Sequence, residues 1–317
     1  MTTRTKHQQR GVAVIMALLI MTLAASTATY VVWQQSLWVR QLENISDRAK
    51  ADQLAAGAID FARDALKQDK KTDVDSLDEA WAQPVTLPAD NATVTGQVTD
   101  EQGRFNLNSL AGSNSTQGAP PGASQGPRKV FEQLLTNLDI KNAPELAAAV
   151  ADWMDASNNN NNTADLYYLS RNPPYRAGQQ PLADASELIR IQGFDEDIVR
   201  KLSPYVTALK DSNTPINVNT ASEEVLAAIF NPALAKSIVR KPSDAPFKSI
   251  SEVQAQLGTN PNVSCAAGSC YDVKSSYYSV HVKVQSGLVE ANYTALLHRD
   301  PSSQTWPAIL TRKDAAD

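Results

Sequence analysis

The side chains best suited to binding an ion are gathered between residues 152 and 165 of the chain. Asp152, Asp155 and Asp165 carry carboxylates, and a run of asparagines fills positions 158–162 between them. Ca²⁺ takes about six to eight oxygen ligands and accepts carboxylate and amide oxygens from flexible loops. The pattern predicts a calcium site, with a solvated polar loop as the alternative. Amide oxygens are weaker ligands than carboxylates, so the asparagines indicate a reduced affinity.

Cys265 and Cys270 are the two cysteines of the chain, in a stretch rich in glycine, alanine and serine. An exported protein can form disulfides, and this spacing suits a small loop, so we predict a structural disulfide between them. A metal pair is disfavoured because no histidine or second cysteine pair accompanies the two thiols.

No group of residues in the sequence has the spacing of a catalytic site. Residues 122–126 match the G-x-S-x-G pattern of a nucleophile elbow, but that motif works only between a buried strand and a helix. Here proline and glycine flank it on both sides. The three histidines, His7, His281 and His298, form no metal-binding motif. We therefore predict that the chain is not an enzyme.

A run without charged side chains extends from Val12 to Trp33. At ~1.5 Å per residue, such a run crosses a ~30 Å hydrocarbon core as one helix. Basic residues precede it, among them Arg4 and Arg10, and a long polar region follows, which places the N-terminus in the cytoplasm and the remainder outside. The run is too long for a cleaved secretory signal. A simple signal anchor is one interpretation.

The remainder of the chain, about 280 residues, is long enough for two domains of ordinary size. The chain is 42% hydrophobic and 20% charged, which predicts a globular protein, and its formal net charge of −5 disfavours a nucleic-acid partner. The membrane helix is predicted to continue to about Lys67. One apolar face of this helix, expected to pack on a sheet, consists of Ala51, Leu54, Ala58, Phe61 and Ala65.

Strand patterns occur at both ends of the globular part. Residues 92–99 and 104–110 flank a turn signal at 100–103, which predicts a β-hairpin. Further strands are predicted at 278–284, 288–297 and 306–311.

Helical patterns occupy the middle of the chain, after an exposed linker rich in glycine, serine and proline. Helices are predicted at 130–138, 143–154, 183–191, 196–207, 222–230, 232–239 and 249–257. Because strands lie on both sides of this block, the predicted fold class is α+β, with a large, mainly helical insert that interrupts a discontinuous domain.

Two segments of the helical block resemble helix-hairpin-helix modules, which bind DNA through a glycine-rich turn. The first keeps Gln192-Gly193-Phe194, whereas Phe230-Asn231-Pro232 replaces the glycine turn of the second. Few basic residues lie nearby. One alternative function is therefore a membrane-anchored DNA-binding protein of the competence type; the other interpretation is a compact helical fold, of the SAM or helix-hairpin-helix type, used for protein contacts.

Arg10-Gly11, directly before the apolar run, resembles the cleavage site of type IV pilin-like proteins. The resemblance implies cleavage by a prepilin peptidase after Gly11, so that the mature chain begins at Val12. The family usually carries glutamate at the fifth mature position, where it neutralises the N-terminal amine of a neighbouring subunit. Met16 stands there in this chain. A subunit without that carboxylate is suited to the end of a fibre.

Several motifs occur in the order typical of the protein K family of the type II secretion system. They are Asp152-Trp-Met-Asp155, Tyr167-Tyr168-Leu169, Asn172-Pro-Pro-Tyr175, Ser186-Glu187-Leu188, Tyr205-Val206-Thr207 and Ile216-Asn-Val-Asn-Thr-Ala221. Members of this family are minor pseudopilins, and the resemblance covers most of the chain.

The resemblance implies a pilin-like α+β domain at 34–110 and 259–317, a cleaved leader at 1–11, a membrane helix at 12–33, a linker at 111–127 and a helical insert at 128–258. It implies a calcium-binding head at the tip of the pseudopilus, which serves protein export across the outer membrane. The implied partners are the minor pseudopilins I and J, with H as a further candidate, the inner-membrane platform and the prepilin peptidase. The implied location is the inner membrane, with a single span and a periplasmic C-terminal part.

Overall fold

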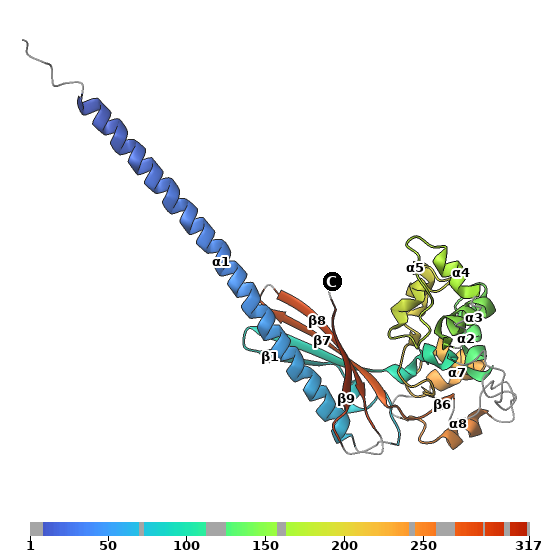
Figure 1. The fold of residues 1–317 in the computed structure, drawn as a ribbon. Helices are drawn as coiled ribbons and strands as arrows, with labels where there is room; N and C mark the ends of the chain where they lie inside the picture. The colour runs from blue at the N-terminus through green and yellow to red at the C-terminus, as the bar shows by residue number, and fades with distance from the viewer. Residues whose placement is uncertain are drawn as a thin grey trace, which may run out of the picture.

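The structure is a computed structural model that describes residues 9–69, 73–111, 125–156, 163–240, 245–257, 270–287, 289–300 and 305–315. A long N-terminal helix leaves the head of the molecule as an extended rod, and its C-terminal half lies across an antiparallel sheet (Figure 1). A separate helical lobe stands beside this sheet. The mixed helix and sheet architecture predicted from the sequence is therefore present.

The rod is α1 (Gln9–Gln68), a helix of 60 residues. At ~1.5 Å per residue it is about 90 Å long, which exceeds a membrane span. The residues that it buries against the sheet share a spacing of three and four; they are Ala51, Ala55, Ile59, Ala62 and Leu66. The predicted continuation to about Lys67 is confirmed.

The prediction of which face of α1 is buried is wrong, because the face that packs on the sheet is adjacent to the predicted one. Ala51 is buried as expected, but Phe61 is 54% exposed, and Leu54 and Ala58 are only partly buried. Apolar residues populate two adjacent faces of this helix, and the sheet covers the one that contains Ile59. Periodicity alone does not rank two such faces, because both satisfy the same spacing.

The sheet has five strands in the order β1-β2-β7-β8-β9, and every neighbouring pair is antiparallel. The strands are β1 (Val85–Ala89), β2 (Ala92–Asp100), β7 (Tyr277–Ser286), β8 (Val289–His298) and β9 (Ala308–Ala315). Alternate residues of β7 and β8 point to α1, which explains the alternating pattern of the sequence; they include Val280, Val282, Val284, Tyr293 and Ala295. The predicted C-terminal strands are confirmed.

The predicted hairpin between residues 92–99 and 104–110 is wrong. The Asp100 side chain accepts a hydrogen bond from the Gln102 backbone N–H at 2.8 Å and begins a 3-10 turn, η2 (Glu101–Gly103), so the chain leaves the sheet. The strand β2 pairs instead with β1, which was not predicted, and with β7 from the far end of the chain. The residues after the turn form β3 (Phe105–Asn106) and η3 (Leu107–Leu110).

The helical lobe contains short helices that mostly follow the predicted positions. They are α2 (Gln125–Asn137), α3 (Ala143–Met154), α4 (Thr163–Leu169), α5 (Glu196–Leu202), α6 (Glu223–Ile229), α7 (Pro232–Val239) and α8 (Ile250–Leu257). The segment predicted as a helix at 183–191 is a 3-10 helix, η5 (Ala185–Arg190), and α5 ends before the predicted 207 because Val206 and Thr207 form β4. The helix α4 was not predicted.

Two hydrophobic cores divide the described residues. One joins α1 to the sheet, and the other fills the helical lobe. Phe105, Leu107 and Leu110 belong to the helical core, as does Tyr271, although residues 104–110 and 270–273 were expected in the pilin-like domain. The physical reason is strand pairing: β3 pairs in parallel with β4 (Val206–Thr207), and β5 (Ile216–Asn217) pairs in parallel with β6 (Tyr271–Asp272).

Candidate functional site

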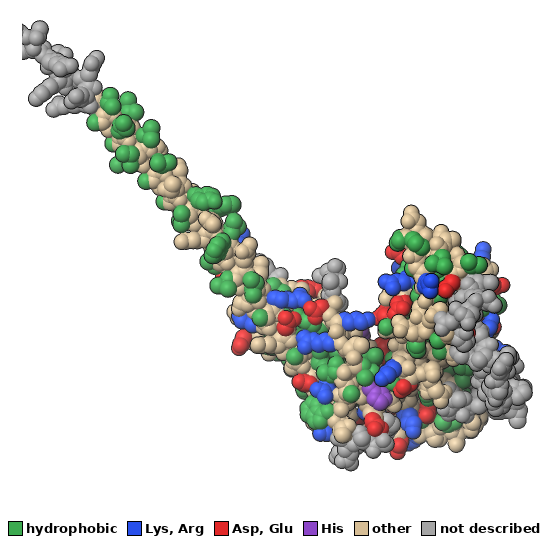
Figure 2. Space-filling view, viewed as in Figure 1, with side chains coloured by type: hydrophobic (Ala, Val, Ile, Leu, Met, Phe, Trp, Pro, Cys, Tyr) green, Lys and Arg blue, Asp and Glu red, His purple; other side chains and the backbone are tan. Residues whose placement is uncertain are grey.

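The N-terminal half of α1 holds the predicted processing and tip positions. Gly11 and Val12 lie near the start of the helix, and Met16 lies about one turn further along. The side chains of Val12 and Met16 are exposed. Among the described residues, α1 is the one helix long and apolar enough to cross a membrane. Figure 2 shows the hydrophobic surface of this part of the rod and the charged side chains gathered on the head.

Aromatic side chains mark where the apolar run ends. Tyr30 and Trp33 lie with their ring centroids 6.2 Å apart, and Trp38 follows on the next turns of the helix. Such rings prefer the level of the lipid headgroups. Arg40 is the first charged residue after Val12. The boundary therefore lies near residues 30–40 of α1.

Apolar side chains that were not singled out from the sequence continue on α1 at and beyond this boundary. Trp38, Leu42 and Ile45 are 69%, 68% and 67% exposed. Their spacing of four and three places them on one face, where they form a stripe. The distance from Val12 to Ile45 is about 50 Å along the helix, whereas the hydrocarbon core is ~30 Å thick. Lipid therefore does not cover the entire apolar surface of the rod.

The predicted calcium ligands flank residues 157–162, which lie outside the described residues. Asp152 and Asp155 lie at the C-terminal end of α3, and Asp165 lies in the first turn of α4. The Asp165 Oδ1 accepts a hydrogen bond from the Ala177 backbone N–H at 3.2 Å. The carboxyl end of a helix carries partial negative charge, which favours a cation. The donor set therefore suits Ca²⁺, and the calcium site stays a prediction.

Another acidic group does meet within the described residues. Ligand oxygens of Asp69, Asp75 and Glu79 lie within 4.8 Å of one another. Arg299 Nη1 donates to Asp69 Oδ2 at 3.0 Å, and Arg299 Nη2 donates to Asp75 Oδ1. Trp81 Nε1 donates to Glu79. The guanidinium pairs with two of the three carboxylates and Trp81 donates to the third, so we interpret the group as a buried ion-pair and hydrogen-bond network that holds the end of α1 to the sheet.

Cys270 lies directly before β6 and is disulfide-bonded. Cys265 lies outside the described residues, so the pairing of these two cysteines stays a prediction. Ser124 of the G-x-S-x-G pattern also lies outside them. His281 faces Thr294 Oγ1 at 3.3 Å, and the His298 ring packs on Tyr277 with centroids 4.7 Å apart. Both contacts are structural ones within the sheet.

A polar network that was not predicted from the sequence contacts both lobes. Asp100, at the end of β2, is buried, and its Oδ2 accepts hydrogen bonds from Thr220 Oγ1 and Ser275 Oγ, each at 2.6 Å. Asn217 Nδ2 donates to the same oxygen at 3.1 Å and to the Asp75 carbonyl at 3.0 Å. Because Asn217 and Thr220 belong to the helical lobe, the network connects that lobe to the sheet.

Burial controls the electrostatics of this junction. It raises the pKa of the Asp100 carboxyl to about 6, although hydrogen bonds from Ser275 and Thr220 oppose the shift. Burial also raises the pKa of Asp75, and the nearby charge of Arg299 partly offsets that effect. Two neighbouring carboxyls in one buried site disfavour each other's ionisation.

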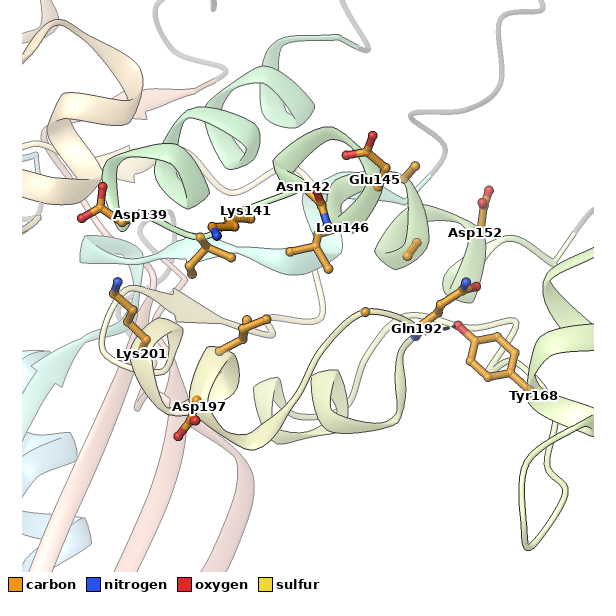
Figure 3. Close-up of a pocket in the computed structure, with 15 residues that line it drawn as sticks. Asp139, Lys141, Asn142, Glu145, Leu146, Asp152, Tyr168, Gln192, Asp197 and Lys201 are labelled. Atoms are coloured by element: carbon orange, nitrogen blue, oxygen red, sulfur yellow. Dashed lines mark hydrogen bonds between the residues drawn. The ribbon is translucent and has the colours of Figure 1, made fainter.

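A groove lies between α3 and α5, beside the turn that resembles a helix-hairpin-helix module. It has a volume of about 670 Å³, and Gly193 in that turn has a φ of 88°, which a residue with a Cβ rarely adopts. Figure 3 shows the groove, with Asp139 and Lys201 at one end and Asp152 and Tyr168 at the other. The backbone N–H of Gln192 donates to the Tyr168 hydroxyl at 3.3 Å.

Charge argues against DNA in this groove. The carboxylates that line it outnumber the ammonium groups; they are Asp139, Glu145, Asp152 and Asp197, against Lys141 and Lys201. Phosphate binding depends on clustered lysine and arginine. The glycine turn is therefore present without the positive surface that a nucleic-acid interface requires.

Comparison with known proteins identifies the family of this chain. Two sequence models described as "Type II secretion system (T2SS), protein K" match residues 103–211 and 216–266. Type II secretion system protein K of Pectobacterium carotovorum subsp. carotovorum is 30% identical over 310 residues, which covers 92% of this chain and 93% of that protein. The protein of the same name from Pseudomonas aeruginosa is 34% identical over 286 residues and covers 84% of this chain and 83% of its own length.

A solved structure has the same fold. A chain of the GspK-GspI-GspJ complex from the type 2 secretion system of enterotoxigenic Escherichia coli aligns with a TM-score of 0.75 at 24% identity. The alignment covers 87% of this chain and all of that chain. No comparison supports the DNA-binding alternative. The chain therefore belongs to the type II secretion system protein K family, and it is a minor pseudopilin of type II secretion.

Proposed function

We propose that this chain occupies the tip of the type II secretion pseudopilus, where it begins assembly and caps the fibre. The observation that supports a place in the fibre is the exposed apolar surface of α1, which continues beyond Trp33 to Ile45. Exposed apolar stripes outside lipid mark surfaces that bind protein. In a fibre of pilin-like subunits, neighbouring helices provide the cover for such a stripe.

The tip position rests on Met16. It lies on the apolar part of α1, where a carboxylate would be tolerated only if it were paired. With methionine at this place, the chain has no anion to offer the N-terminal amine of a subunit that arrives beside it. Growth above this subunit is therefore electrostatically unfavourable, and the side of the fibre toward the membrane is the side that grows.

The helical lobe supports the same position by its size. It stands beside the sheet as a second body with its own core (Figure 1). The network around Asp100 and Asn217 fixes the lobe to the sheet, so it cannot swing freely out of the way. A body of this bulk at the tip obstructs the stacking of a further subunit above it.

The partners that fit are the minor pseudopilins I and J, and H is a further candidate. The structure with the same fold comes from a complex that contains GspI and GspJ. We extend that assembly to this chain because its rod offers an uncovered apolar stripe at Trp38, Leu42 and Ile45. The inner-membrane platform and the prepilin peptidase complete the proposed set of partners.

The proposed topology follows from the membrane helix. The prepilin peptidase cleaves after Gly11 on the cytoplasmic side, and the mature chain, whose first residue is Val12, stays in the inner membrane. The aromatic residues Tyr30 and Trp33 lie at the periplasmic surface of the membrane, where rings of this kind are favoured. The head is then periplasmic, in a compartment that permits disulfides.

The proposed cofactor is Ca²⁺, held between α3 and α4 by Asp152, Asp155 and Asp165. A cation there would neutralise the charge of these carboxylates and would link the end of α3 to the start of α4. Its role in this proposal is structural.

The test of the assembly proposal places a charge on the α1 stripe. Leu42→Arg puts a guanidinium into the proposed contact between helices, where its desolvation is costly, and should weaken recovery of I and J with the full-length chain roughly tenfold or more. The matched control is Asn44→Arg, which adds the same charge two residues away on another face of α1. Copurification from detergent-solubilised membranes measures both. Equal recovery with the two variants would contradict the proposal.

A further inference from the structure

We propose that five residues, at the point where α1 leaves the head, form a polar clamp that fixes the direction of the rod relative to the sheet. The clamp consists of Arg48 and Asp52 of α1, Tyr293 of β8, and Arg312 and Asp314 of β9. It goes beyond the proposed function and rests on that function only for its use, which is to hold the head at a set angle on the end of the fibre.

The five side chains of the clamp contact one another across three elements. Arg48 Nη2 donates to Asp314 Oδ2 at 2.9 Å, and Arg312 Nη2 donates to the Asp52 carbonyl at 3.3 Å. The Tyr293 hydroxyl donates to the Asp52 carboxylate. Both guanidinium groups lie over the Tyr293 ring, with Cζ of Arg48 5.7 Å and Cζ of Arg312 5.4 Å from its centroid. Figure 2 shows charged side chains gathered where the rod meets the head.

The segment that contains β9 runs alongside α1 in the opposite direction, and the two match in length. At one end, Arg63 Nε donates to the Pro307 carbonyl at 2.8 Å, and at the other end Arg48 contacts Asp314. From Arg63 back to Arg48 the helix rises about 22 Å, and from Pro307 to Asp314 an extended strand covers about 23 Å. The clamp therefore forms without bending either element.

The apolar packing of α1 is weakest beside the clamp. Ala51 and Ala55 are the fully buried residues of α1 nearest this point, and Leu54 is partly buried. The larger buried side chains, Ile59 and Leu66, lie further along the helix. Because apolar stabilisation follows the area removed from water, alanines hold a helix less firmly than isoleucine or leucine does. Polar contacts can therefore decide the direction of α1 at the point where it leaves the sheet.

The clamp is separate from the two hydrophobic cores. Among the described residues of β9, none belongs to either core, and all of residues 308–314 are exposed. Opening of the clamp uncovers little apolar surface beyond the Tyr293 ring, so it changes the direction of the rod without unfolding the head. The side chains of Arg48 and Asp314 are half-exposed, and salt weakens ion pairs of this kind.

The experiment measures the direction of the rod in the full-length chain in detergent micelles. Spin labels at Gln41 of α1 and Gln97 of β2, both exposed, report the distribution of distances between rod and sheet by pulsed electron paramagnetic resonance. The wild type should give a narrow distribution. About 1 M salt, where the Debye length is about 3 Å, should broaden it.

Charge reversal tests the clamp itself. Arg48→Glu sets like charges against Asp52 and Asp314, and it should broaden the distribution about twofold or more while the head melts near the wild-type temperature. Adding Asp314→Arg to this variant restores an opposite pair and should recover most of the wild-type width. The matched control is Lys50→Glu, the same reversal two residues away, where the lysine contacts Asp47 at 3.8 Å; it should keep the wild-type width.

Several results would overturn the clamp and leave the proposed function standing. They are a wild-type width for Arg48→Glu, equal broadening by the Lys50→Glu control, no recovery on adding Asp314→Arg, and a wild-type distribution that salt does not change. A much lower melting temperature of Arg48→Glu than of the control would also overturn it, because these contacts would then hold the fold together. Failure of the wild-type chain to copurify with I and J would instead overturn the tip position and leave the clamp standing.

Discussion

At the scale of single residues, Asp100 is a buried side chain that contacts both lobes at their joint. Its Oδ2 accepts three hydrogen bonds from Asn217, Thr220 and Ser275, and its Oδ1 accepts one from the Gln102 backbone. Burial raises its pKa to about 6, above the ordinary value of 3.8. The folded state therefore binds a proton that the unfolded chain releases at lower pH. This contribution to stability is complete below about pH 3.8 and is lost as the pH rises through about 6.

We expect Asp100→Asn to remove this pH dependence. The free energy of unfolding of the variant should be about 1–3 kcal/mol lower at neutral pH. The reason is that the amide NH2 group would face the hydrogen-bond donors that surround the carboxylate in the wild type. As the pH falls from 7.5 to 4, the free energy of unfolding of the wild type should rise by up to about 3 kcal/mol, and that of the variant should not show this rise. Denaturant unfolding across this range measures the difference. Asp90→Asn, on the exposed turn after β1, is the control and should follow the wild type. A constant difference between wild type and Asp100→Asn would contradict the account.

A second prediction at the scale of single residues concerns cleavage after Gly11. Gly11→Leu should leave an unprocessed precursor, since a bulky side chain at the scissile bond blocks a peptidase that requires glycine there. Ala13→Leu adds the same side chain two residues further on and should be processed normally. Mass spectrometry of the N-terminal peptide distinguishes a chain that starts at Val12 from one that retains the leader. Normal trimming of the Gly11 variant would contradict cleavage after Gly11, and a wild-type chain that keeps residues 1–11 would show that the chain is a simple signal anchor.

Some residue roles could be predicted from the sequence and others could not. The uncharged run from Val12 to Trp33 is a local property, and α1 contains it. The face of α1 that packs on the sheet depends on strands far along the chain, so the choice between Ile59 and Phe61 was not accessible. The exposed positions Leu42 and Ile45 were visible by their spacing, but the spacing does not tell a buried face from a docking face.

At the scale of elements, local signals predicted helix ends well. The helix α7 begins at the predicted residue because Asn231 Oδ1 accepts from the Leu234 N–H at 2.9 Å and Pro232 fits the first turn. The hairpin predicted at 92–110 was wrong because strand pairing depends on distant residues and not on local signals. Its second strand pairs with β4 instead, and such a short strand depends on a distant partner more than on its own residues.

At the scale of elements, the testable prediction is that Ca²⁺ binds between α3 and α4. Ca²⁺ should raise the melting temperature of the protein, since a ligand at about 100 times its Kd stabilises the folded state by about 2.7 kcal/mol. Asp165→Asn should remove most of this rise and keep an oxygen that can accept from the Ala177 N–H. The control is Asp139→Asn, an exposed change after α2, which should keep the full response. An unchanged rise in the Asp165 variant, or none in the wild type, would exclude the site.

At the scale of the whole molecule, two bodies with separate cores are joined by the network around Asp100 and by further contacts, among them the bonds of Glu101 with Thr207 and Ser279. The helical body begins after η2 and ends at Val273, and the sheet resumes at β7. The sequence showed that an insert exists, because strands flank helices. It did not place the boundaries, since residues near Phe105 and Tyr271 have strand patterns and yet pair within the insert. The result is a rod with a wide head, a shape suited to the end of a fibre (Figure 1).

The central claim is that assembly stops at this subunit because Met16 offers no carboxylate to the amine of a following chain. The most direct test is electron microscopy of pseudopili in which the periplasmic head carries a gold label. The account predicts label at one end of each fibre for the wild type, and label along the shaft as well for Met16→Glu. Label repeated along wild-type shafts, with other subunits beyond it, would contradict the account.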